Sequence, residues 1–72
     1  MKKHWKRHTL INGYEVAEDG AIRVTKEGKV HGCPEPVRSL CRTGWCIWLQ
    51  PIDSPASLIL REEGMVNLWN DA

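Results

Sequence analysis

One histidine and three cysteines in the middle of the chain have the side-chain types that bind zinc. They are His31, Cys33, Cys41 and Cys46. One His with three Cys is enough for a tetrahedral site, but standard zinc sites have closely spaced Cys pairs at both ends of the ligand set. This spacing does not match that pattern, and a buried cysteine also packs as a small hydrophobic residue. We therefore expect no metal and no other cofactor, with zinc on these four residues as the alternative.

Side chains arranged for catalysis are not evident in the sequence. It contains no glycine-rich phosphate loop and no nucleophile elbow. Glu62 and Glu63 are adjacent on a predicted helix, so their carboxylates diverge and do not form an acid–base pair. A nucleophilic cysteine would need a positioned base, and His31 is the histidine placed for that role. We expect a protein that is not an enzyme.

The first eight residues, MKKHWKRH, form a basic segment around one tryptophan. This segment has a formal charge of +4, whereas the remaining residues carry six Lys and Arg against nine Asp and Glu, a charge of −3. A basic segment suits a phosphate backbone, and an aromatic side chain within it can stack on a base. The alternative is a terminus that only improves solubility. The predicted nucleic-acid contacts are Lys2, Lys3, Trp5, Lys6, Arg7, Arg23 and Arg38.

The chain has four tryptophans and no phenylalanine in 72 residues. A chain of this length forms one small domain with a marginal core. We expect Trp45 and Trp69 to lie in that core and Trp5 to be partly exposed. Tryptophan is common in binding hot spots, so the surplus favours a protein partner as the alternative to nucleic acid. The oligomeric state stays open.

The basic start is not followed by the apolar stretch of a secretory signal, and no apolar run approaches the length of a membrane span. We therefore expect a cytoplasmic protein without a membrane partner. In a reducing cytosol its three cysteines would remain thiols.

The stretch INGYEVAEDGAIRV, residues 11–24, has the period-two alternation of half-buried strands. Asn12-Gly13 predicts a turn, and residues 17–20 predict a second turn with glycine in a left-handed position. The apolar residues on either side of that second turn should point inward. After it, residues 26–29 predict a third turn and residues 29–32 a possible short strand. This half of the chain is therefore expected to form a β-meander with tight connections.

The second half begins with Pro34 and Pro36, which predict a loop or a sheet edge. Residues 38–50 predict a strand, a turn at 42–44 and a second strand. Because the second strand is apolar on both faces, we expect it to be central in the sheet or covered on both sides. Residues 57–60 fit a last strand or the start of a helix, and the following residues fit a short helix with an apolar stripe. The sequence thus predicts an α+β, mostly β fold: a basic arm at 1–8 and, at 9–72, one antiparallel sheet of four to five strands with a carboxy-terminal helix.

The stretch NGYEVAEDGAIRV resembles the core motif of NUMOD-type modules, the nuclease-associated DNA-binding domains of homing endonucleases and bacteriophage HNH proteins. TGWCIWLQ resembles a later strand of that family, and LILREEGMVNLWNDA resembles its closing strand and helix. Val24 stands where the family has a second Arg, and Leu60-Arg61 where it often has His-Arg. No HNH metal motif follows.

The resemblance implies a free-standing module of phage type in a bacterial host. It implies a DNA-binding protein, with a regulatory role as one form of that function and Arg23 as the contact within the motif. The alternative is a scaffold that binds and inhibits a host protein, as anti-CRISPR and host-takeover proteins do.

Overall fold

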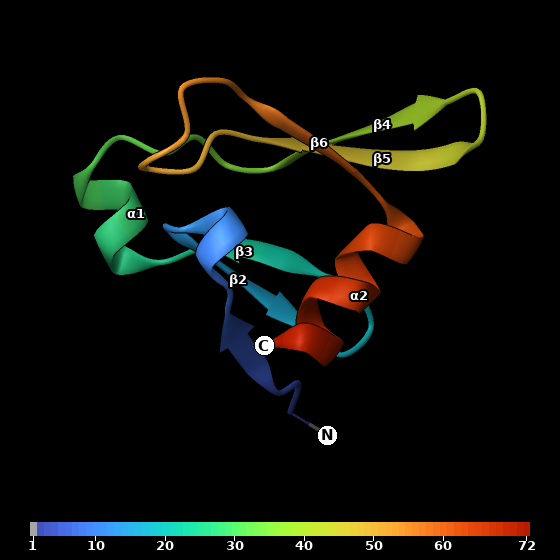
Figure 1. The fold of residues 1–72 in the computed structure, drawn as a ribbon, viewed down its shortest axis with the longest axis horizontal. Coiled ribbons are helices and arrows are strands. Elements are labelled where there is room, and N and C mark those ends of the chain that lie inside the picture. Colours follow the sequence, from blue (N-terminus) through green and yellow to red (C-terminus); the bar gives the residue numbers. More distant parts are fainter. Residues whose placement is uncertain (1) are drawn as a thin grey trace.

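The computed structural model of the protein describes residues 2–72 and consists of two antiparallel sheets and a carboxy-terminal helix, with two shorter helical segments (Figure 1). None of the helices in residues 2–72 is long and apolar enough to cross a membrane. The elements in chain order are β1 (Trp5–Arg7), the 3-10 helix η1 (Thr9–Ile11), β2 (Tyr14–Ala17), β3 (Ile22–Val24), α1 (Lys26–Val30), β4 (Val37–Cys41), β5 (Gly44–Leu49), β6 (Leu58–Arg61) and α2 (Glu62–Asp71).

The predicted α+β, mostly β class is confirmed, but the prediction of one sheet with four to five strands is wrong. The structure has two sheets of three strands, with the orders β1-β2-β3 and β4-β5-β6. The chain leaves β3 through α1 and then through the segment of Pro34 and Pro36, which cannot donate hydrogen bonds to a sheet. Consequently β4 starts a second sheet instead of extending the first.

The first sheet confirms the alternation predicted for residues 14–24. Tyr14, Val16 and Val24 are buried, and Ile22 packs against them. The turn between β2 and β3 ends at Gly20, which has a φ of +87°. Three residues of the predicted basic arm form β1, which pairs with β2 as an edge strand.

The turn predicted at Asn12-Gly13 is present, and the 3-10 helix η1 precedes it. Gly13 has a φ of +100°. The Nδ1 atom of His8 accepts a hydrogen bond of 3.1 Å from the Leu10 N–H and thereby caps η1. This cap directs Ile11, which is fully buried, into the core.

Helix α1 occupies the residues for which a turn and a short strand were predicted, and that prediction is wrong. Thr25 caps the helix, because its hydroxyl accepts a hydrogen bond of 3.0 Å from the Gly28 N–H. The same hydroxyl donates to the Gly13 carbonyl at 3.2 Å. This pair of bonds joins α1 to the start of β2, a contact that local propensity does not indicate.

The second sheet confirms the predicted strand, turn and strand at residues 38–50, with β5 as its central strand. Residues 58–61 form strand β6, the first of the two predicted alternatives, and the predicted terminal helix is α2. The core lies between the two sheets and α2. Its buried apolar members are Ile11, Tyr14, Val16, Val24, Ile47, Leu49, Met65 and Leu68.

Trp69 packs against this core, as predicted, but the prediction of a core position for Trp45 is wrong. Trp45 is 50% exposed. It pairs with Leu40 near the β4–β5 turn, beyond Cys46, where the pairing with β6 ends. In Figure 1 this end of the hairpin extends past the start of α2, at the margin of the fold and away from the buried core residues of β5.

A disulfide joins Cys41 to Cys46, so the prediction that all three cysteines are thiols is wrong for these two. The tight turn between β4 and β5 brings their Cα atoms to 6.1 Å, within the range of disulfides. Cys33 is a free thiol, half-buried, and burial raises its pKa.

Candidate binding surfaces

Four of the seven predicted nucleic-acid contacts lie together at the first sheet. Trp5 pairs with Ala17, and Glu15 pairs with both Arg7 and Arg23, so these side chains share the face that points away from the core. The Arg23 guanidinium lies 4.0 Å from the centroid of the Trp5 ring. The ammonium of Lys3 lies 5.9 Å from the same centroid. These distances describe an aromatic side chain that already stacks with a cation of its own chain.

Carboxylates accompany each of the three cations on this face. Arg23 pairs with Glu15 at 3.0 Å, and Lys3 pairs with Asp19 at 3.0 Å. Arg7 lies 3.9 Å from Glu27. The Ala21 N–H and Lys3 lower the pKa of Asp19, because both favour its charged form. The face therefore carries both signs of charge, which weakens its attraction for phosphates.

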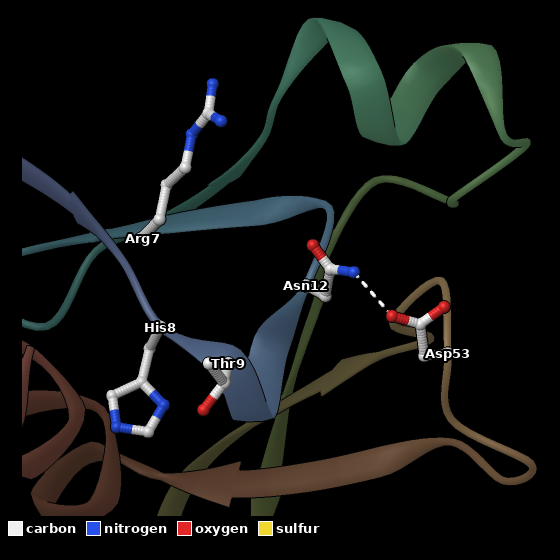
Figure 2. A pocket seen from close by; sticks show the side chains of 5 residues that line it. All are labelled: Arg7, His8, Thr9, Asn12 and Asp53. Carbon is white, nitrogen blue, oxygen red and sulfur yellow. Dashed lines mark hydrogen bonds between the residues drawn. The ribbon is translucent and has the colours of Figure 1, made fainter.

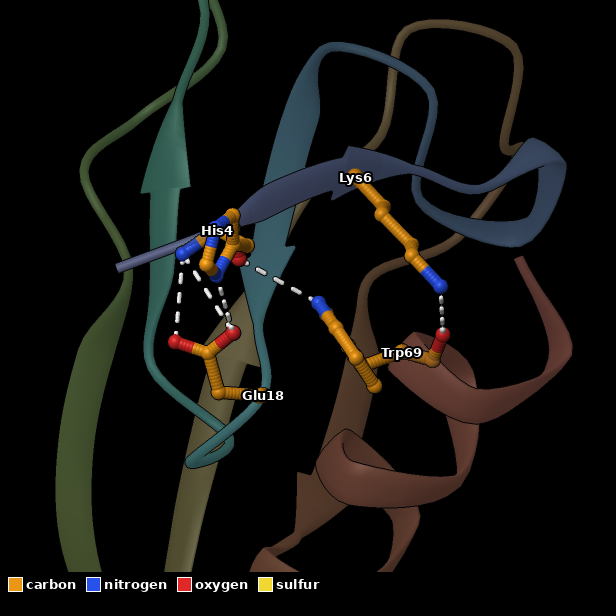
Figure 3. Close-up of polar contacts among 4 residues, drawn as sticks. All are labelled: His4, Lys6, Glu18 and Trp69. Carbon is orange, nitrogen blue, oxygen red and sulfur yellow. Dashed lines mark hydrogen bonds and ion pairs between the residues drawn. The ribbon is translucent and has the colours of Figure 1, made fainter. Parts of the chain in front are cut away.

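Lys6 does not belong to this face, because it points inward from β1 toward α2 (Figure 3). Its ammonium lies 3.9 Å from the centroid of the Trp69 ring and donates to the Trp69 carbonyl at 3.4 Å. The Trp69 indole N–H donates to the His4 carbonyl at 3.2 Å, and the backbone N–H of His4 donates to Glu18 at 3.1 Å. Lys6 and His4 thus hold the amino-terminal strand against α2.

The remaining predicted contacts lie elsewhere. Lys2 is exposed ahead of β1, and Arg38 is exposed on β4 of the second sheet. Arg23 and Arg38, both predicted as contacts, lie in different sheets. The four zinc candidates do not converge either: two of them form the disulfide, and residues 2–72 contain no group of three His, Cys, Asp or Glu side chains that could hold a metal ion.

The outer face of the second sheet presents three apolar side chains in line. Val37 pairs with Trp48, and Trp48 pairs with Ile59, so one residue from each strand forms what we call the apolar row. Val37 is 52% exposed and Ile59 is 67% exposed. The opposite face of this sheet holds the buried Ile47 and Leu49.

The sequence indicated that β5 is apolar on both faces, and this led to the expectation of a covered strand. The central position of β5 is confirmed, but only one of its faces packs against the rest of the chain. Sequence reasoning missed the apolar row because cross-strand register decides which side chains line up. The signal was present in the alternation of Cys46, Trp48 and Gln50 opposite the core residues of the same strand.

A hollow of about 300 Å³ lies between η1 and the loop that follows β5 (Figure 2). Asn12 and Asp53 bridge it with a hydrogen bond of 2.6 Å. Figure 2 shows Arg7 and His8 pointing in opposite directions, and the Nδ1 atom of His8 is used by the cap of η1. The polar groups around the hollow therefore do not converge on one point where a ligand or a reacting atom would sit.

Comparison of the chain with protein families, with curated proteins and with solved structures finds no match. The resemblance to NUMOD-type modules therefore stays a prediction that rests on the motif in residues 12–24.

Proposed function

We propose that the chain is a small, non-enzymatic binding protein that attaches to another protein through the outer face of its second sheet. The apolar row supports this proposal: Val37, Trp48 and Ile59 form a continuous apolar line across all three strands, with its two ends more than half exposed. An aromatic side chain at the centre of an apolar patch is typical of protein-binding hot spots. The phage-type resemblance favours an inhibitor of a bacterial host protein as the form of this function.

The first sheet gives less support to nucleic acid as the main partner. Its predicted contacts are paired with Glu15, Asp19 and Glu27, and Lys6 is turned toward Trp69. A phosphate would have to compete with these carboxylates, so each contact would contribute less counterion release than an unpaired cation does. The side chains of the apolar row, by contrast, form no ion pairs that a partner would have to displace.

Capture of a partner from a nuclease-treated bacterial lysate tests the proposal. The wild-type chain is compared with Ile59→Asp, which places a charge in the row, and with Val30→Asp, which makes the same kind of change at the 84% exposed end of α1. We expect Ile59→Asp to reduce capture about thirtyfold, the size of a hot-spot effect, and Val30→Asp to leave it unchanged. Capture that is equal in all three would refute the proposed surface. Ile59→Thr, which retains β-branching, provides a second variant if the aspartate unfolds the sheet.

Nucleic-acid binding is the second candidate, favoured by the presence of Trp5, Arg7 and Arg23 on one face. A gel-shift titration with duplex DNA at several salt concentrations tests it. Binding through these cations predicts an affinity that falls steeply with salt and a weaker complex for Arg23→Ala. No shift at low salt removes this candidate.

A further inference from the structure

Strand β4 forms an edge of the second sheet, with β5 on one side and no strand of residues 2–72 on the other. Residues 37–40 are exposed, and residue 41 is half-buried. The strand contains no proline, since Pro36 precedes it. An exposed edge strand of this kind offers unpaired backbone N–H and C=O groups to another strand.

The hairpin that contains this edge is basic. Residues 36–52 carry Arg38 and Arg42 and no Asp or Glu. Within residues 2–72, no carboxylate oxygen lies within 4.0 Å of either guanidinium, in contrast to Lys3, Arg7 and Arg23 of the first sheet. Both cations beside the exposed edge are thus available to a partner.

A second copy of the chain does not suit this edge. Two β4 strands paired antiparallel around Ser39 would bring the Arg38 side chains of both copies onto one face, with both Arg42 side chains at the ends of the pair. In this register the two Arg38 side chains are diagonal neighbours, within reach of each other because arginine is long, and their like charges oppose the pairing. The arginines therefore act against self-pairing and favour an acidic strand.

We propose that β4 accepts an extended segment of the partner protein as a fourth strand, and that this segment alternates apolar and acidic residues. The alternation follows from the two faces of β4. Val37 lies on the outer face, so a residue opposite it continues the apolar row, whereas a residue opposite Arg38 lies on the other face and meets a cation. The inference rests on the proposed function, because it describes how the partner of that surface is recognised.

A capped peptide of alternating glutamate and valine, long enough to span β4, is the probe. Its binding is followed by backbone amide hydrogen exchange of the full chain, resolved by residue with NMR. We expect this peptide to slow the exchange of residues 37–41. A control peptide of the same length that alternates lysine and valine should bind clearly more weakly. Arg38→Glu should weaken glutamate–valine binding about fivefold, since an attractive cross-strand pair becomes a repulsive one. Lys26→Glu, the same charge change in the first turn of α1, should not alter it.

The strand-pairing proposal is overturned if the glutamate–valine peptide does not bind, if residues 37–41 keep their exchange rates, or if the lysine peptide binds equally well. These outcomes differ from a failure of the proposed function. If Ile59→Asp loses capture but the peptide leaves the exchange of β4 unchanged, the outer face binds the partner protein and the proposal of an added strand is refuted. If the peptide protects β4 but Ile59→Asp captures the partner normally, the proposed binding face is refuted and the strand pairing at β4 is supported.

Discussion

Lys6 on the amino-terminal strand places its ammonium 3.9 Å from the centroid of the Trp69 ring on the carboxy-terminal helix. The same ammonium donates to the Trp69 carbonyl in the last turn of α2, where the helix dipole favours a cation. Two residues that are 63 positions apart in the sequence thus join both ends of the chain. A residue predicted as a phosphate contact has a structural role.

Replacement of Lys6 by Met should therefore lower the free energy of unfolding. The cation–π contact and the contact with the helix end together contribute about 1 kcal/mol. For a domain of this size, that corresponds to a decrease of roughly 4–8 °C in the melting temperature. Lys2→Met, at an exposed position, is the control. Equal melting temperatures for the two variants would contradict the role assigned to Lys6.

Tyr14 joins the two halves of the fold through its hydroxyl, which donates to the Pro34 carbonyl at 2.6 Å and accepts from the Gln50 N–H at 3.3 Å. Tyr14→Phe should destabilise the protein by about 1–3 kcal/mol, because both backbone groups lose a partner in a partly buried site. Chemical denaturation at pH 7 measures this difference. A Phe variant as stable as wild type would show that water replaces the hydroxyl without cost.

The same side chain predicts a dependence on high pH. Burial raises the pKa of Tyr14 above its ordinary value of 10.0, so the folded state favours the protonated phenol. Its contribution to stability is complete below pH 10 and decreases as the pH rises through the folded-state pKa. The difference in unfolding free energy between wild type and Tyr14→Phe should accordingly narrow above pH 10.

Gly28 shows how tertiary packing overrides helix propensity. A Cβ atom at this position would lie 2.1 Å from the Gly13 carbonyl oxygen and 2.9 Å from Val24. Gly28→Ala should therefore destabilise the protein by about 1–3 kcal/mol, although alanine is the better helix former. Gly64→Ala in α2 is the matched control, because in residues 2–72 no atom outside the backbone of its own helix and its two chain neighbours would lie within 4 Å of the added Cβ, and it should stabilise by about 0.5–1 kcal/mol. Thermal melts of both variants test the pair, and a stabilising Gly28→Ala would refute the close contact.

Local periodicity explains which parts of the fold the sequence predicts correctly. The alternation around Tyr14 and Val16, the hairpin at residues 38–49 and the apolar stripe of α2 each depend on neighbours within a few positions. Helix α1 does not depend on such local neighbours alone. It depends on the hydroxyl of Thr25 and on the packing of Gly28 against the Gly13 carbonyl, which is distant in the sequence. The separation into two sheets likewise follows from the path of the connecting segment.

The candidate sites are harder to predict because charge pairing is a property of the folded chain. Arg23 and Glu15 are neighbours only through the register of β2 and β3, and Lys3 meets Asp19 only because β1 pairs with β2. The sequence therefore shows a basic segment where the structure has a face of mixed charge. The apolar row depends on register in the same way.

Asp19 predicts a dependence on low pH. The Ala21 N–H and Lys3 lower its pKa below the ordinary value of 3.8, so its contribution to stability is present above that pH and is lost as the pH falls through the folded-state pKa. Asp19→Asn should melt below wild type at pH 7, and the difference should disappear in strong acid. Since Asp19 is exposed, we expect a small effect. A difference that persists at low pH would assign the stabilisation to another group.

The disulfide between Cys41 and Cys46 predicts one reactive thiol, whereas the sequence led us to expect three. Unfolded without a reductant, the protein should react with an alkylating reagent at Cys33 alone, and after reduction at all three cysteines. Intact mass spectrometry counts the adducts. Reduction should also lower the melting temperature, because the opened β4–β5 turn gains freedom in the unfolded state. The Cys33→Ser variant is the control, since it should show no adduct before reduction and the same decrease in melting temperature afterwards. Three adducts on the unreduced wild-type protein would show that the hairpin is held by its strand pairing without the covalent bond.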